Sequence, residues 1–125
     1  MKSKLLKTKN ILEVKLENDW LGSTVINGIQ DLSGKLKDII VKQEELFGNP
    51  RLKLPGSIGT PQYISEPYEA TRLIFHLKGK IEKPIAFCDI NRDECVSSFN
   101  VYITDNKQKD SVIYYLKLFY TKLNL

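Results

Sequence analysis

Few residues in this sequence have side chains that commonly carry out catalysis or bind metal ions. His76 is the single histidine, and Cys88 and Cys95 are the two cysteines. A zinc site needs three or four ligands, and a nucleophilic serine or cysteine needs a base beside it. The sequence therefore predicts no catalytic residues, no metal ligands and no cofactor. We expect Cys88 and Cys95 to be small strand residues, with a disulfide between them as the alternative.

The position of His76 also disfavours a catalytic role. It alternates with Phe75 and Leu77 along a run of strand-forming residues, so its side chain is expected to point away from their shared face. We interpret it as a structural or surface histidine. The acidic residues within 89–94 lie around one predicted turn, where carboxylates are expected to be solvated rather than paired across a cleft.

The loop FGNPRLKLPGSIGTP, residues 47–61, contains three glycines and three prolines, a composition that invites comparison with phosphate-binding loops. Such a loop needs the pattern G-x-x-x-x-G-K-[ST] between a strand and a helix. The stretch 56–60 lacks the lysine, and the prolines remove backbone N–H donors. We interpret the loop as a helix stop followed by a crossing to the next strands.

Basic residues are concentrated at the start of the chain, which has 125 residues and a formal net charge of +4. Residues 1–10 contain four lysines and no acid, and beyond them basic and acidic residues are equal in number. We expect residues 1–10 to be a basic flexible arm, suited to peripheral contact with an acidic lipid surface. Residues 11–125 are expected to form a single domain. Because this domain is neutral, nucleic acid is not an expected partner.

Residues 24–47 carry the strongest helical pattern in the sequence. Apolar residues recur there at spacings of three and four, which places them on one face of a helix. Ser23 or Thr24 would supply the N-cap, and Gly48 would end the helix. The pair at 33–34, serine and glycine, marks a kink or break, since a glycine inside a helix costs about 1 kcal/mol relative to alanine.

Strand-like patterns occupy most of the remaining sequence. Residues 11–16 alternate apolar and charged side chains, with a helical turn as the alternative. Residues 72–78, 85–90 and 96–103 are separated by polar turns and predict an antiparallel meander. Segment 111–123 combines a helical stripe with the aromatic and β-branched composition of strands, and we favour a strand over its first ten residues. The predicted fold is α+β, with one long N-terminal amphipathic helix packed on an antiparallel meander of three to five strands.

The order of short motifs between residues 24 and 116 resembles that of a known family. A helix is followed by Phe47-Gly48-Asn49-Pro50 and Pro55-Gly56-Ser57-Ile58, and then by the strand motifs 73–79, 84–89 and 99–103. This order is similar to the cytochrome c oxidase assembly factor one family and to the related twenty-one-kilodalton Tim subunit of the mitochondrial import machinery. The resemblance implies a non-enzymatic α+β domain beside the mitochondrial inner membrane, binding other proteins during import or respiratory-complex assembly. Without the resemblance, a cytoplasmic location is expected.

We therefore predict a non-catalytic protein-binding domain, an accessory or assembly factor of a membrane protein complex. It would recognise partners through an edge strand or a face of the sheet. One alternative is a bacterial immunity protein that neutralises a toxin, because such proteins are small and lack motifs. A second alternative is a small hydrolase or nuclease that uses His76 with acidic residues and lysines.

Overall fold

The protein is described by a computed structural model, which places residues 10–36, 38–46, 51–52, 62–63 and 70–123. Most of the regular structure is extended, and the two helices lie near the two ends of the described chain. The elements in order are β1 (Ile11–Leu21), α2 (Gly22–Asp31), β2 (Ile39–Leu46), β3 (Arg51–Leu52), β4 (Gln62–Tyr63), β5 (Ala70–Leu77), β6 (Pro84–Ile90), β7 (Cys95–Ile103), the short 3-10 helix η1 (Asn106–Gln108) and α3 (Lys109–Leu123).

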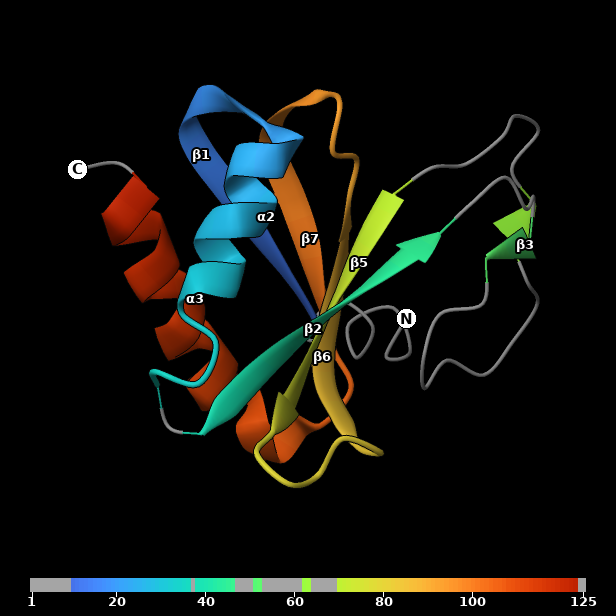
Figure 1. Cartoon of the computed structure of the whole chain (residues 1–125), viewed down its shortest axis with the longest axis vertical. Helices are drawn as coiled ribbons and strands as arrows, with labels where there is room; N and C mark the ends of the chain where they lie inside the picture. Colours follow the sequence, from blue (N-terminus) through green and yellow to red (C-terminus); the bar gives the residue numbers. More distant parts are fainter. Residues whose placement is uncertain (1–9, 37, 47–50, 53–61, 64–69, 124–125) are drawn as a thin grey trace, which may run out of the picture.

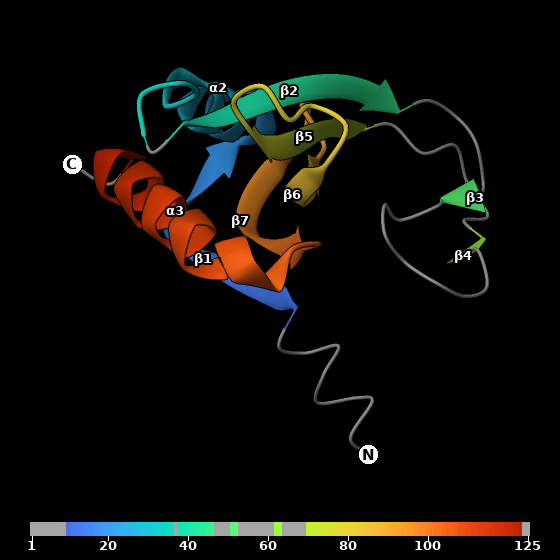
Figure 2. The ribbon, with the colours of Figure 1, turned by 90° about the horizontal axis from the view of Figure 1, so that it is seen from below.

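Five of the strands form one antiparallel sheet in the order β1-β7-β6-β5-β2, as Figure 1 shows. The strands β5, β6 and β7 are consecutive in the chain and form its centre, while β1 and β2 form its two edges. The short strands β3 and β4 pair only with each other. Figure 2 shows the sheet curving around α3, with α2 beside it on the same face.

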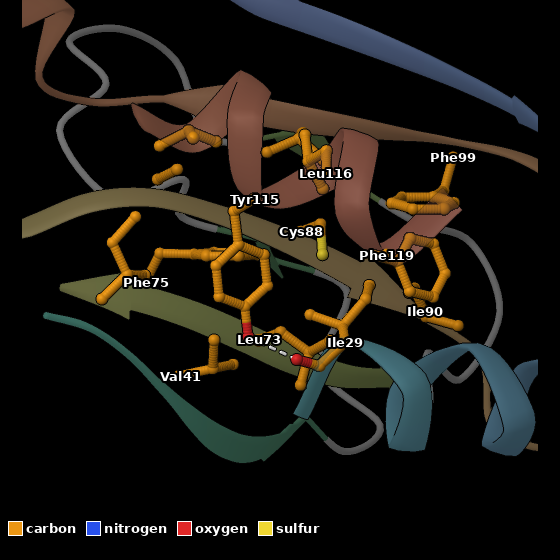
Figure 3. Close-up of a cluster of buried hydrophobic side chains, with 14 of the residues drawn as sticks. Ile29, Val41, Leu73, Phe75, Cys88, Ile90, Phe99, Tyr115, Leu116 and Phe119 are labelled. Carbon is orange, nitrogen blue, oxygen red and sulfur yellow. Dashed lines mark hydrogen bonds between the residues drawn. The ribbon is translucent and has the colours of Figure 1, made fainter. Parts of the chain in front are cut away.

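The core lies between the two helices and the sheet face that they cover. Residues alternate between faces along each strand, so Leu73, Phe75 and Val101 point toward the helices and are fully buried. The Tyr115 ring of α3 meets the Phe75 ring edge to face, with centroids 5.3 Å apart. As Figure 3 shows, its hydroxyl donates a hydrogen bond to the Ile29 carbonyl, which joins α3 to α2. Burial, followed by the nearby Asp31 charge, raises the pKa of Tyr115.

The predicted long N-terminal helix over residues 24–47 is wrong. The helix α2 ends at Asp31, and residues 39–46 form the edge strand β2. The backbone between them has positive φ at Gly34 (78°) and Asp38 (62°), values that no helix contains. At the start of β2 the burial alternates as in a strand, with Ile39 and Val41 buried and Ile40 between them only partly buried. Their spacing from earlier apolar residues matched a helix only by coincidence.

The predicted N-cap is also wrong, because α2 begins at Gly22 without a side-chain cap. The first helical N–H groups are instead satisfied by the turn that joins β6 to β7. Gly22 donates to the Glu94 carbonyl at 2.7 Å, and Ser23 donates to the Arg92 carbonyl at 3.0 Å. Tertiary contacts with a segment about 70 residues later in the chain thus fix the start of the helix.

The strand favoured for residues 111–120 is wrong as well, because this segment belongs to α3. The helical stripe was the correct reading of the pattern. Val112, Tyr115 and Phe119 are buried against the sheet and α2, and this burial outweighs the strand preference of aromatic and β-branched residues. The meander predicted for 72–103 is present as the antiparallel strands β5, β6 and β7.

Two predicted segments fall mostly outside the described residues. Of the basic arm, residues 1–10, only Asn10 is described, and of the loop 47–61 only Arg51 and Leu52 are. The expectations for both segments stay predictions.

Candidate protein-interaction edge

The outer edge of β2 is capped by side chains and turns of the preceding segment. Asp38 accepts a backbone hydrogen bond from Lys78 beside β5, so the alternation of strand hydrogen bonds points the backbone groups of Ile39 and Val41 outward. Ser33 accepts from the Val41 N–H at 2.9 Å, and Gln30 donates to the Val41 carbonyl at 2.7 Å.

The outward backbone groups of Ile39 are also capped, in this case by other backbone groups. Gly34 donates to the Ile39 carbonyl at 2.8 Å, and the Ile39 N–H donates to the Leu36 carbonyl at 2.8 Å. Because its donors and acceptors are already used, this part of β2 cannot accept another strand.

The other edge of the sheet, formed by β1, has no such cap among the described residues. Ile103 donates to the Asn10 carbonyl at 2.7 Å, so the same alternation turns the backbone groups of Leu12 and Val14 toward β7. The backbone groups of Ile11, Glu13 and Lys15 therefore point away from the sheet, and β7 is the only described strand beside β1. This row of outward donors and acceptors is the open edge of the protein, defined here as residues 11–15 of β1.

A groove of about 460 Å³ follows the open edge on the face that carries the helices. Leu12 and Val14 of β1 form one wall, and Leu116 with Tyr120 of α3 contributes to the other. Partial burial, followed by the nearby Glu17 carboxylate, raises the pKa of the Tyr120 phenol. The groove is lined mainly by apolar side chains, so it can accept every second side chain of a strand laid along β1.

The opposite face of the open edge carries charge. Glu13 and Lys15 are exposed and lie on the same side of β1, with their charged atoms 3.8 Å apart. An exposed pair of this kind adds little to the stability of the free protein. Facing a second strand, however, the two charges can select its register, since opposite charges across strands attract and like charges repel.

The structure places the sequence-predicted chemical residues apart from one another. Cys88 points toward the helices, whereas His76 lies on the other face of the sheet, as the alternation with Phe75 predicted. His76 is buried rather than solvent-facing, with Nδ1 2.9 Å from the Leu77 carbonyl oxygen, and its Nε2 lacks a hydrogen-bond partner within the described residues. Cys88 and Cys95 are both free thiols.

Burial, with a smaller contribution from Asp89, raises the pKa of the Cys88 thiol. A thiol with a raised pKa stays protonated, and a protonated thiol is a poor nucleophile. Among the described residues, no three histidines, cysteines or carboxylates gather as a metal site would require. The geometry thus brings together neither a nucleophile with a base nor a set of metal ligands in the part of the chain described.

A buried ion pair, which the sequence pattern did not indicate, lies on the sheet face opposite the helices. Asp89 is in β6 rather than at a solvated turn, and Arg72 lies directly opposite it in β5. The guanidinium binds the carboxylate in two places, at 2.7 and 3.0 Å, and both side chains are almost entirely buried. The Arg72 guanidinium also stacks on the Phe87 ring, 4.7 Å from its centroid. The signal that could have located the pair is the register of the two strands.

Neither of the described helices is long and apolar enough to cross a membrane. No family model, curated protein or solved structure matches this chain. The sheet edge and its groove are therefore the features from which a function can be argued.

Proposed function

We propose that this protein is a non-catalytic protein-binding domain that takes up an extended segment of a partner along the open edge, residues 11–15. The partner segment would pair with the outward backbone groups of Ile11, Glu13 and Lys15. Alternate side chains of that segment would enter the groove beside α3. Main-chain hydrogen bonds would provide affinity, and the groove would provide selectivity.

The difference between the two edges of the sheet is the observation that carries this proposal. Exposed edges promote unwanted pairing, and proteins usually block them. At β2, Gln30 and Ser33 occupy the outward groups of Val41. The regular part of β1 has no corresponding contact among the described residues, and it contains no proline. We attribute the open residues 11–15 of β1 to a partner, because the chain caps residues 39–41 of its other edge strand and leaves β1 without a corresponding contact.

A role as an accessory or assembly factor of a membrane complex remains a prediction. It depends on the resemblance described above, whose first feature was a helix ending at residue 47, and the strand β2 removes that helix. The immunity-protein alternative would use the same open edge against a toxin, so gene context would separate the two. The hydrolase alternative has weaker support, because His76 is buried and its one described hydrogen bond is to the Leu77 carbonyl rather than to a carboxylate or a lysine.

Replacing Glu13 with proline tests strand addition at the open edge. Proline removes one outward N–H and leaves the β1–β7 hydrogen bonds in place, since proline is accepted where the N–H of an edge strand faces solvent. We expect Glu13→Pro to lose at least roughly 90% of the partner protein captured by the wild-type chain, because an edge that lacks a donor cannot continue the ladder. Affinity purification from the native cell, followed by mass spectrometry, measures this loss.

Glu13→Ala is the matched control, because it removes the same carboxylate and keeps the N–H. It should capture the partner at a yield close to the wild type. Lys15→Pro tests the same mechanism at the next outward position, which keeps the experiment informative if one proline variant unfolds. Undiminished capture by a folded Glu13→Pro variant would contradict strand addition at β1.

A further inference from the structure

We propose that, in the absence of another partner, the open edge of one chain pairs with the open edge of a second copy to form a two-fold symmetric dimer. This inference rests on the proposed ability of β1 to accept a strand. It names a specific occupant for the edge and predicts both the register and the size of the assembly. Three features of β1 and β2 support it.

The first feature is the charge pattern of β1, which selects one register. In an antiparallel pair, a residue whose backbone groups point toward the partner strand faces another such residue. Because every second residue of β1 points outward, the two-fold axis must pass through a residue and not between two residues. An axis through Val14 sets Glu13 of each chain against Lys15 of the other, and this pairing occurs twice. An axis through Glu13 would oppose two glutamates, and one through Lys15 would oppose two lysines. Among these axes, cross-strand attraction favours the one through Val14. An axis through Leu16 would set Lys15 against Glu17, but it lies beyond Lys15, where the regular pairing of β1 with β7 is interrupted.

The second feature is the match of apolar side chains on the face that carries the helices. With the axis at Val14, the two Val14 side chains face each other where the two backbones approach most closely. Leu12 of each chain faces Leu16 of the other. These residues are partly buried in the single chain, and the groove between β1 and α3 lies beside them. The same axis brings the two grooves next to each other, so pairing removes further apolar surface from water.

The third feature is the way the assembly closes, because the pairing uses the same patch on both chains and residues 39–41 of β2 are already capped. A sheet with two open edges can add copies without end, whereas an interface that uses the same patch on both subunits closes. Pairing of the two β1 strands gives a continuous sheet of two five-stranded halves with β2 at each outer edge. At both outer edges Gln30 and Ser33 occupy the outward groups of Val41. The expected product is a closed dimer rather than a filament.

Charge reversal at the open edge tests the register in solution. Sedimentation equilibrium of the purified full chain over a dilution series should give a mass rising toward twice the 14.4 kDa of one chain. Lys15→Glu and Glu13→Lys should each weaken the dimer by roughly tenfold, because two attractive pairs become repulsive. The double variant, Glu13→Lys with Lys15→Glu, restores both pairs and should recover the wild-type dissociation constant.

A cysteine placed on the expected axis tests the geometry independently. In a Cys95→Ser background, Val14→Cys should form a covalent dimer under mild oxidation, since residues at such positions lie about 4.5 Å apart between Cα atoms. The control is Leu21→Cys, which is exposed on the same strand and would lie roughly 45 Å from its copy at about 3.3 Å per residue. It should not cross-link.

A monomer at every concentration, together with equal cross-linking of Val14→Cys and Leu21→Cys, would overturn the dimer. Failure of the double charge reversal to recover the dimer would overturn the register. Either result is distinguishable from failure of the proposed function, which is read from the capture of other proteins by Glu13→Pro and Glu13→Ala. A monomer whose capture of a partner is lost only in Glu13→Pro would show that the edge serves other chains alone.

Discussion

Replacing Asp89 with alanine is expected to lower the free energy of unfolding by about 3 kcal/mol. The Asp89 carboxylate binds the Arg72 guanidinium at two points, and both side chains are buried on the sheet face opposite the helices. Removing the carboxylate leaves the charge of Arg72 in the same low-dielectric position with less compensation, which is the costly way to break a buried pair. Denaturant unfolding, followed by circular dichroism, measures the loss.

A double replacement, Arg72→Met with Asp89→Leu, is the control. It removes both charges and keeps comparable side-chain volume, so it should be clearly more stable than the single Asp89→Ala variant. If the double variant is as unstable as the single one, packing around Phe87 rather than the ion pair accounts for the loss. A change below about 1 kcal/mol for Asp89→Ala would contradict the burial of the pair, since exposed pairs contribute only this much.

Replacing Gly22 with alanine is expected to destabilise the protein by about 3 kcal/mol, the upper part of the range for an added group in a packed region. A Cβ atom at this position would lie 1.8 Å from the Asn91 carbonyl oxygen, which belongs to the backbone and cannot rotate away. Gly22 also donates to Glu94 at 2.7 Å, so relieving the clash would break the contact that starts α2. The midpoint of chemical denaturation is the quantity to compare.

Gly28→Ala provides the matched comparison within the same helix. There the added Cβ would lie 2.9 Å from a ring carbon of Phe119, a side chain rather than a backbone atom. Alanine also gains about 1 kcal/mol of helix propensity over glycine, so the net change should be much smaller than at Gly22. Equal effects at the two glycines would contradict the close backbone contact between the β6–β7 turn and the start of α2.

The strands were predicted better than the helices. Alternation between neighbouring residues is a local pattern, whereas apolar residues at helical spacings can come from two different elements. In residues 96–103 the period of two placed Phe99, Val101 and Ile103 on one face, and all three are in the core. In residues 24–47 two elements of different type supply apolar residues that together imitate one helix. The break at 33–34 was visible, but its size was not, since only the structure reveals the positive φ of Asp38.

The candidate site was partly visible in the sequence. Alternation in residues 11–16 correctly predicted a strand, and edge-strand recognition was among the expected modes of binding. The sequence could not show which strands lie at the edges, because β1 pairs with β7 across more than 70 residues of chain. Nor could it show that Gln30 and Ser33 cap β2, since both were assigned to the interior of a helix.

The fold and the proposed function are connected through the two helices. The segment that leaves α2 caps residues 39–41 of β2, and α3 stands beside β1 with the groove between them. The first part of one edge is thereby closed, and the other edge is left available with an apolar groove alongside. This asymmetry is the basis of the proposed uptake of an extended partner segment at β1.

Residue-resolved amide hydrogen exchange, measured with and without a bound partner, tests the open edge most directly. In the dilute isolated chain, the outward N–H groups of Glu13 and Lys15 should exchange rapidly, while the Val41 N–H is protected by Ser33. When a captured partner or a second copy is bound, Glu13 and Lys15 should become protected and Val41 should remain unchanged. Protection that appears elsewhere in the bound state, with Glu13 and Lys15 still exchanging rapidly, would contradict strand addition at β1.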